Sequence, residues 1–170
     1  MARFCGQERC LIDANGRIKL SPRFEQDFRR AGALEIVLHC LPEAALGVYP
    51  LPVWEEIRAQ EAKSVLKAAT SIVARRQLRR FGAMTQIETL SNQGRLTVPP
   101  GFRDILQLAP GTEAILVGCE IGVEIWNAER WQKEVQLLWE HEAERGEAEM
   151  KADVLSAGKS GDSSGSARQT

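Results

Sequence analysis

An internal repeat constrains the fold of this chain more than any other feature of its sequence. The segment GRIKLSPRF, which begins at Gly16, recurs as GRLTVPPGF from Gly94. Further along, VYPLPVW ending at Trp54 is matched by IWNAERW ending at Trp131. Because a turn, a proline, the apolar spacing and a terminal tryptophan recur in the same order, we predict two copies of one structural unit.

The repeat divides the chain into four segments. We expect a first unit over residues 4–58, a linker helix over 59–84, a second unit with its following helix over 85–139, and an acidic helix with a disordered tail over 140–170. The tail prediction rests on the Gly/Ser-rich composition from Gly158 onward, because such a segment cannot offset the entropy of its own ordering. The whole chain, with 44% hydrophobic and 26% charged residues, has the composition of a globular protein.

The sequence also predicts the compartment. No apolar run approaches the roughly 20 residues that a membrane helix needs, and residues 1–6 lack the apolar core of a signal peptide. The four cysteines form no C-x-x-C pair and have no histidine at zinc-ligand spacing; they are Cys5, Cys10, Cys40 and Cys119. We therefore expect a cytoplasmic protein with reduced thiols, no metal, no cofactor and no membrane partner. His39 is expected to be a strand residue rather than a ligand.

Each unit is predicted to begin with a hairpin and to continue with a short helix and two strands. The pair Asn15-Gly16 between alternating strands is a strong hairpin signal, and residues 91–94 replace it in the second unit. Ser21-Pro22 and Pro99-Pro100 suit the opening of a helix. The helix residues expected in the core are Phe24, Phe28, Phe102, Ile105 and Leu106. The strands expected next cover residues 34–38 and 114–117, each followed by a strand that ends at Tyr49 or Trp126.

Two longer helices are predicted outside the repeated elements. Residues 52–80 are expected to form one helix that Gly82 can end, because apolar residues recur there at helical spacing. These residues are Ala62, Val65, Leu66, Ala69, Ile72 and Val73. The second helix follows Asn127, a natural N-cap, and carries an apolar stripe of Trp131, Val135, Leu138 and Trp139.

The hairpins hold the residues with the strongest case for function. Side chains alternate along a strand, so Arg17 and Lys19 share one face while Ile18 and Leu20 share the other. The second unit repeats this pattern, with Arg95 and Thr97 outward and Leu96 and Val98 inward. Asp13 stands four residues before Arg17, where its carboxylate can hold the guanidinium in a fixed direction. The spacing alone leaves two interpretations open: a solvated strand face, or a surface that binds an anion.

The chain resembles the MraZ family over residues 4–139. The segments that carry the resemblance are FCG at 4–6, LIDANGRI at 11–18, YPLPVW at 49–54, QGRL at 93–96, VG at 117–118 and EIW at 124–126. Their order makes the match more specific than any single piece. The resemblance implies an α+β fold of two tandem swapped-hairpin AbrB-like β-barrel units in a pseudo-two-fold arrangement, with a linker helix and a C-terminal helix.

The resemblance also implies a function. Members of the family are transcriptional regulators that assemble into rings and bind repeated promoter elements upstream of division and cell-wall genes. This chain is then expected to be a nucleoid-associated homo-oligomer that binds double-stranded DNA. The expected DNA-binding residues are Asp13, Arg17, Lys19, Arg95, Thr97 and Arg103.

Three positions depart from the family pattern. Ser91 stands where an aspartate is usual, Ser21 where a proline is usual, and Glu25 at a position that is often basic, whereas Arg103 keeps that basic character in the second unit. These departures predict that the two units differ in how they contact DNA.

The net charge of −1 is low for a DNA-binding protein, but it is unevenly spread. The segment 140–153 carries six acids and two bases, which leaves the part of the chain before it weakly basic. The cluster Arg75, Arg76, Arg79 and Arg80 is interpreted first as favourable charge at a helix C-terminus, and the pair Arg29-Arg30 likewise. The acidic segment is interpreted as a solvated helix face, with competition for the basic surface as the alternative.

No sequence motif indicates an enzyme. The chain has no Gly-rich phosphate loop and no G-x-S-x-G elbow, and its two histidines belong to no recognisable motif. The alternative to a DNA-binding regulator is a ring-forming interaction module without DNA binding, in which Tyr49, Trp54 and the helix after them serve partners.

Overall fold

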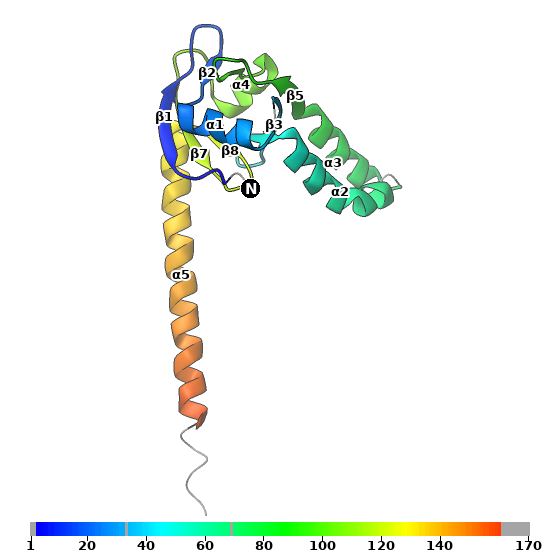
Figure 1. Ribbon diagram of the computed structural model, residues 1–170. Helices are drawn as coiled ribbons and strands as arrows, with labels where there is room; N and C mark the ends of the chain where they lie inside the picture. Colours follow the sequence, from blue (N-terminus) through cyan, green and yellow to red (C-terminus); the bar gives the residue numbers. More distant parts are fainter. Residues whose placement is uncertain (1–2, 33, 69, 161–170) are drawn as a thin grey trace, which may run out of the picture. The chain divides into compact units, whose positions relative to one another are not determined.

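The computed structural model describes residues 3–32, 34–68 and 70–160, which form an α+β fold of eight strands and five helices (Figure 1). The first half of the repeat contains β1 (Gln7–Leu11), β2 (Arg17–Lys19), α1 (Pro22–Arg30), β3 (Glu35–Cys40) and β4 (Leu46–Pro50). Two helices follow, α2 (Leu51–Ala68) and α3 (Ile72–Ala83). The second half contains β5 (Thr85–Thr89), β6 (Arg95–Thr97), α4 (Pro100–Leu106), β7 (Glu113–Gly118) and β8 (Val123–Asn127), and α5 (Ala128–Ser160) comes last.

The two short helices begin where the prolines predict. The Ser21 side chain caps α1 by accepting a hydrogen bond from the Phe24 amide at 3.4 Å, and Pro22 occupies the first turn. Helix α4 begins at Pro100 after Pro99, without a side-chain cap. Phe24, Phe28, Phe102 and Leu106 are buried as expected, but Ile105 is 46% exposed, so its predicted place in the core is wrong. Ile105 lies about 100° around the helix from Leu106, outside the inward stripe.

A six-stranded antiparallel sheet joins the two halves. Its strand order is β1-β7-β8-β4-β3-β5, so the order is the same from either edge once each strand is matched with its counterpart in the other half. At the centre β4 pairs with β8, where Leu46 opposes Ile125 and Val48 opposes Val123. At the edges β1 pairs with β7, and β5 pairs with β3.

The predicted local hairpins are wrong as strand pairs, although their turns form. The Gly16 amide donates to the Asp13 carbonyl at 2.9 Å, as a tight turn requires. Beyond the turn, however, β1 pairs with β7 and β2 pairs with β6 of the other half. This exchange lets the apolar faces of both halves share one core, which a local hairpin cannot do. Ile18, Leu20, Leu96 and Val98 all belong to that single buried cluster.

The predicted single helix over residues 52–80 is two helices. Helix α2 ends at Ala68 and α3 starts at Ile72, with the Ser71 side chain accepting from the Ala74 amide at 3.5 Å. Serine competes with the helix backbone for hydrogen bonds and therefore favours a cap over a helix interior. The side chains of Ala62, Val65 and Leu66, and residue Ala69, lie outside the part of the chain that the structure describes.

An aromatic cluster anchors α2 and α3 on the sheet. The His39 ring of β3 lies 5.3 Å from Trp54 and 4.6 Å from Phe81, and Trp54 stacks on Tyr49. His39 Nδ1 is 2.9 Å from the Thr85 hydroxyl oxygen, which confirms that His39 is a strand residue. Tyr49 is buried and the half-buried Trp54 packs against it in this cluster, so both rings contribute to the fold.

Residues Met1–Ala128 and Glu129–Thr170 form two separate compact units. The second consists of most of α5, which begins directly after Asn127 as expected and extends to Ser160, so residues 158–160 are helical instead of disordered. Residues 161–170 of the predicted tail lie outside the described part of the chain. Leu138 and Trp139 of the expected apolar stripe are 48% and 71% exposed. Across the described residues, no helix is long and apolar enough to cross a membrane.

Candidate nucleic-acid interface

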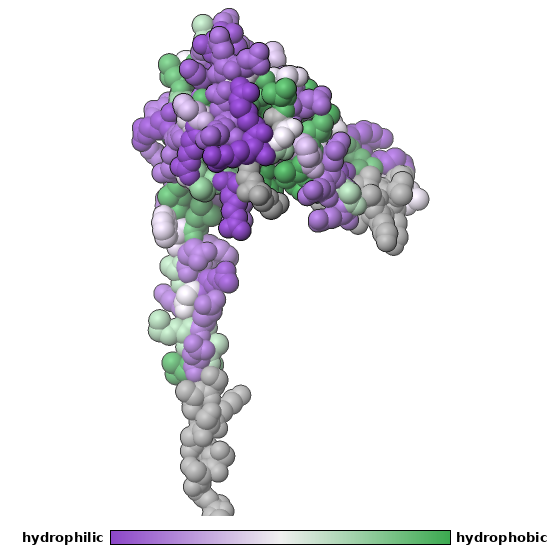
Figure 2. All heavy atoms as spheres, viewed as in Figure 1, coloured by the Kyte–Doolittle hydropathy of each residue, from purple (hydrophilic) through white to green (hydrophobic). Residues whose placement is uncertain are grey.

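The β2–β6 ribbon, formed by Arg17–Lys19 and Arg95–Thr97, gathers four of the expected residues on one face. Arg17 opposes Thr97 and Lys19 opposes Arg95, while Ile18 and Leu96 oppose each other on the buried face. Directly opposed side chains have Cβ atoms about 4.5–5.5 Å apart. Three cations and one hydroxyl therefore project from the same face of the ribbon as two opposed pairs. In Figure 2 the end of the molecule that carries the β2 label in Figure 1 is mainly hydrophilic.

The first loop, residues 13–17, is organised by the Asp13 carboxylate. Its Oδ1 accepts from the Asn15 amide at 2.8 Å and from the Arg17 amide at 2.9 Å. Its Oδ2 accepts from Arg17 Nε at 3.0 Å, which is the ion pair that the spacing predicts. The Arg17 amide and side chain, with the Asn15 amide, lower the pKa of Asp13, so the carboxylate is ionised at neutral pH. The guanidinium is thereby fixed in direction while 39% of its side chain stays exposed.

The second loop, residues 91–95, has the same backbone but a weaker hold on its arginine. The Gly94 amide donates to the Ser91 carbonyl at 2.9 Å, and the Arg95 amide donates to the Ser91 hydroxyl at 2.9 Å. The hydroxyl thus replaces one of the three bonds that Asp13 accepts. Among the described residues, no hydrogen bond or ion pair fixes the Arg95 guanidinium.

Arg103 holds the first loop in place through hydrogen bonds, although it belongs to the second half of the sequence. Its Nε donates to the Val98 carbonyl at 3.0 Å and its Nη2 donates to the Asn15 carbonyl at 3.2 Å. The guanidinium lies directly against Gly16, whose φ of +74° also favours glycine, so any side chain at that position would displace Arg103. Arg103 is therefore a positioning residue in this structure.

Glu25 occupies the equivalent place below the second loop. A Cβ added at Gly94 would lie 2.6 Å from Glu25 Oε2. Glu25 Oε1 accepts from Arg29 at 2.7 Å and 3.2 Å, and Arg29 Nη2 donates onward to the Asn92 carbonyl at 3.2 Å. Arg29 is the residue that sequence reasoning missed, because it was interpreted as a helix-end charge. Its signal was the acid four residues earlier on α1, at ion-pair spacing.

The chemistry of the site suits an anion. Burial raises the pKa of Cys10 and Cys40 to about 11 and that of Cys119 to about 12, so these thiols stay protonated and weakly nucleophilic. All four cysteines are free. No group of acids, histidines and cysteines in the described residues is arranged to hold a metal ion. What the ribbon presents is a compact set of hydrogen-bond donors with positive charge.

The fold and this surface define a class: an α+β protein whose two homologous halves exchange strands and together present a cationic two-stranded ribbon. Residues 81–154 match the family model described as "MraZ protein, putative antitoxin-like". The chain is 34% identical over 137 residues to the transcriptional regulator MraZ of Desulforapulum autotrophicum, covering 80% of this chain and 87% of the relative. It is 33% identical over 135 residues to the transcriptional regulator MraZ of Thermomicrobium roseum, covering 79% of this chain and 89% of the relative. It is 32% identical over 130 residues to the transcriptional regulator MraZ of Herpetosiphon aurantiacus, covering 76% of this chain and 84% of the relative. The chain belongs to the MraZ family.

Proposed function

We propose that this protein is a sequence-specific, DNA-binding transcriptional regulator that reads double-stranded DNA with the β2–β6 ribbon. The observation that carries the proposal is the single face shared by Arg17, Lys19, Arg95 and Thr97. A two-stranded ribbon fits the major groove, where each base pair presents a distinct pattern of donors and acceptors. The curated relatives, which are named as regulators and not as enzymes, support the same conclusion.

The six site residues take different roles in this proposal. Arg17 contacts a base edge, because Asp13 fixes its direction before DNA arrives. Lys19 and the less constrained Arg95 contact phosphates, and Thr97 contacts either group through its hydroxyl. Arg103 positions the first loop through the Val98 and Asn15 carbonyls.

For the fold, we propose two swapped-hairpin AbrB-like units related by a pseudo-two-fold axis, with the boundaries that the repeat predicts. The register supports this arrangement at two points. In the ribbon Ile18 opposes its own counterpart, Leu96. At the centre of the sheet Gly47 opposes Glu124, its counterpart in the alignment that matches Trp54 with Trp131. One axis through both pairs would relate the halves.

We further propose that the protein forms a ring on repeated promoter elements upstream of division and cell-wall genes, as its family resemblance implies, and that it is cytoplasmic and nucleoid-associated. A chain with net charge −1 has little electrostatic affinity by itself, so several ribbons acting together would supply the avidity. Multi-angle light scattering at micromolar concentration is expected to give a mass several times 18.9 kDa. A monomer mass would contradict the ring.

A DNA titration tests the central proposal. Fluorescence anisotropy with a duplex from the region upstream of the protein's own gene is expected to saturate, and a scrambled duplex of the same composition is expected to bind more weakly. The difference is measured at two salt concentrations, because non-specific binding is the more salt-dependent part. Equal binding of both duplexes, or none at micromolar protein, would favour the ring-forming module without DNA binding.

A further inference from the structure

Helix α3 presents a second cationic surface that the ribbon does not include. Its twelve residues contain four arginines and no acid. Ala74, Leu78 and Phe81 lie on its half-buried side. At 100° per residue the arginines fall on the opposite arc, together with Ile72 and Val73, which are 63% and 64% exposed. This arginine face, residues 75, 76, 79 and 80, is distinct from the β2–β6 ribbon.

The start of α3 at Ile72 changes the meaning of these charges. If residues 52–80 were one helix, all four arginines would lie near its C-terminus, where the helix dipole favours cations. Because the helix begins after the Ser71 cap, Arg75 lies at the end of its first turn, where the dipole disfavours a cation, and Arg76 and Arg79 lie in its middle. Arg76 and Arg80 also stand at i, i+4, a spacing at which like charges destabilise a helix. The dipole therefore favours Arg80, which lies in the last turn, but it does not account for the other three arginines.

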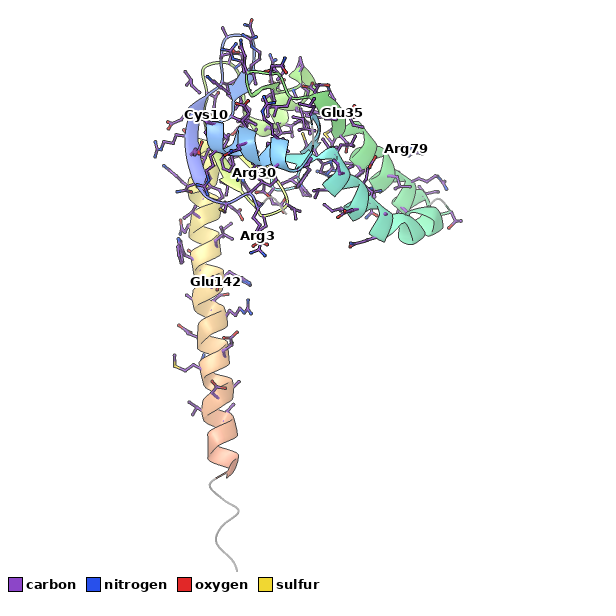
Figure 3. All side chains as sticks on the ribbon, viewed as in Figure 1. Arg3, Cys10, Arg30, Glu35, Arg79 and Glu142 are labelled. Carbon is purple, nitrogen blue, oxygen red and sulfur yellow. The ribbon has the colours of Figure 1, made fainter. Side chains whose placement is uncertain are left out.

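Among the described residues, no acid is paired with three of the four arginines of this face. Elsewhere in the protein several arginines are paired with acids, as in Arg9–Glu113, Arg29–Glu25 and Arg30–Asp27. For Arg76, Arg79 and Arg80, the described residues include no ion-pair partner. All three side chains are at least partly exposed, and Figure 3 labels Arg79 on the helix.

We propose that the arginine face of α3 binds the phosphate backbone of DNA that flanks the segment read by the ribbon. This inference rests on the proposed function. Guanidinium groups bind phosphate oxygens through paired hydrogen bonds, and phosphates are the anions nearest to a DNA-bound protein. Arg76 and Arg80 are separated by about 6 Å along the helix, and one DNA strand places a phosphate at about every 3.4 Å of the duplex axis, so the two guanidinium groups can reach phosphates one or two nucleotides apart. The contact adds affinity without reading sequence.

The test compares two triple variants of the full chain. Arg76→Gln/Arg79→Gln/Arg80→Gln removes three charges from α3 and keeps good helix formers. The control, Arg9→Gln/Arg145→Gln/Lys151→Gln, removes three exposed cations from outside α3 and the ribbon. Affinity is measured against salt on a duplex of about 40 base pairs and on one of about 10 base pairs, a single helical turn. Circular dichroism melting and light scattering verify folding and assembly.

On the long duplex, the α3 variant is expected to bind at least about tenfold more weakly than the control, with the slope of log affinity against log salt reduced by about 2–3 units. On the short duplex the two are expected to differ little, and the preference for the native sequence is expected to persist in both. Equal slopes for both variants, with sequence-selective binding by the unmodified protein, would overturn this inference alone. A changed oligomeric mass of the α3 variant would overturn this inference in favour of an interface between copies of the chain. Absence of selective binding by the unmodified protein would overturn the proposed function itself.

Discussion

In the first loop, residues 13–17, one carboxylate accepts three hydrogen bonds and fixes an arginine, whereas in the second loop, residues 91–95, a hydroxyl accepts one bond from the arginine's amide. Among the described residues, no hydrogen bond fixes the guanidinium of that second arginine. Arg103 lies against Gly16 of the first loop, and Glu25 lies against Gly94 of the second. The backbones of the two loops are the same, down to the cross-strand bonds from Leu20 to Gly94 and from Val98 to Gly16.

The comparison shows that two departures from the family pattern, Ser91 and Glu25, lie at the same loop although they are far apart in the sequence. Ser91 removes an acid from the second loop, and strand exchange brings Glu25 of α1 beneath that same loop. The first site therefore holds Asp13 with two arginines, Arg17 and Arg103. The second also holds one acid and two arginines, because Arg29 is paired with Glu25 and Arg95 belongs to the loop itself. The charge is equal at both sites, but only the first aims its outer arginine.

The largest expected effect comes from removing the two outer arginines separately. Arg17→Ala is expected to reduce the preference for the promoter duplex over the scrambled one by about 1–3 kcal/mol, or roughly 5–150-fold, since a base contact is lost. Arg95→Ala is expected to weaken binding to both duplexes alike and to lower the salt slope by about 0.9. Anisotropy titrations of the two duplexes at several salt concentrations measure both quantities.

Asp13→Ala provides the internal control for that pair. It removes a negative charge, so electrostatics alone would strengthen binding to any DNA. Because it also releases the Arg17 guanidinium, discrimination is expected to fall while affinity for scrambled DNA rises. If Arg17→Ala and Arg95→Ala had identical effects on both duplexes, the two loops would be equivalent and the contrast between them would be wrong.

A smaller effect is expected from the residues below the loops. Arg103→Met keeps much of the length of the side chain but removes its bonds to the Val98 and Asn15 carbonyls, so the first loop loses support worth about 0.5–1.5 kcal/mol. Discrimination is expected to fall by up to about tenfold. The matched variant Arg29→Met removes one bond from the second loop and is expected to leave discrimination nearly unchanged. The same titrations measure the difference, and a larger loss in Arg29→Met would reverse the assignment of the two sites.

The sequence predicts much of the difference between the two loops, but it does not predict which helix residue lies against which loop. The spacing of Asp13 and Arg17 predicts their ion pair, and alternation predicts which strand residues are buried, because both depend on local geometry. The pairing of β2 with β6 depends on which strands share a core, and an Asn-Gly turn carries no information about that choice. Without the exchange, Glu25 and Arg103 would each be assigned to the wrong loop. The break at Ser71 was missed because the apolar spacing on its two sides fits one continuous helix.

A still smaller effect is expected from making the second site resemble the first. In Ser91→Asp/Glu25→Arg the loop regains its acid and the helix regains an arginine at the position equivalent to Arg103. An exposed ion pair of this kind contributes about 0–1 kcal/mol, so discrimination is expected to rise by no more than about fivefold. Ser91→Asp alone places two carboxylates near Gly94, and is expected to gain less than the double variant. Titrations of both variants check this order, and a greater gain from the single variant would contradict the pairing of Glu25 with the second loop.

The smallest expected effect is that of pH on the first loop. The pKa of Asp13 is lowered by the Arg17 amide, the Arg17 side chain and the Asn15 amide, against an ordinary value of about 3.9. For an acid whose pKa is depressed in the folded state, the stabilising contact is fully present above the ordinary value and is lost only as the pH falls through the lowered one. The two loops are therefore expected to keep their difference from about pH 5 to about pH 8, with discrimination changing less than about twofold.

The stability of the fold is expected to depend on pH in the same range through His39, because burial and the nearby Arg80 and Arg58 lower its pKa. The unfolded chain then binds a proton that the folded chain resists, so the melting temperature is expected to fall as the pH drops below about 6.5 while discrimination stays constant. Loss of discrimination near pH 6 in parallel with the melting temperature would show that the first loop depends on a group other than Asp13.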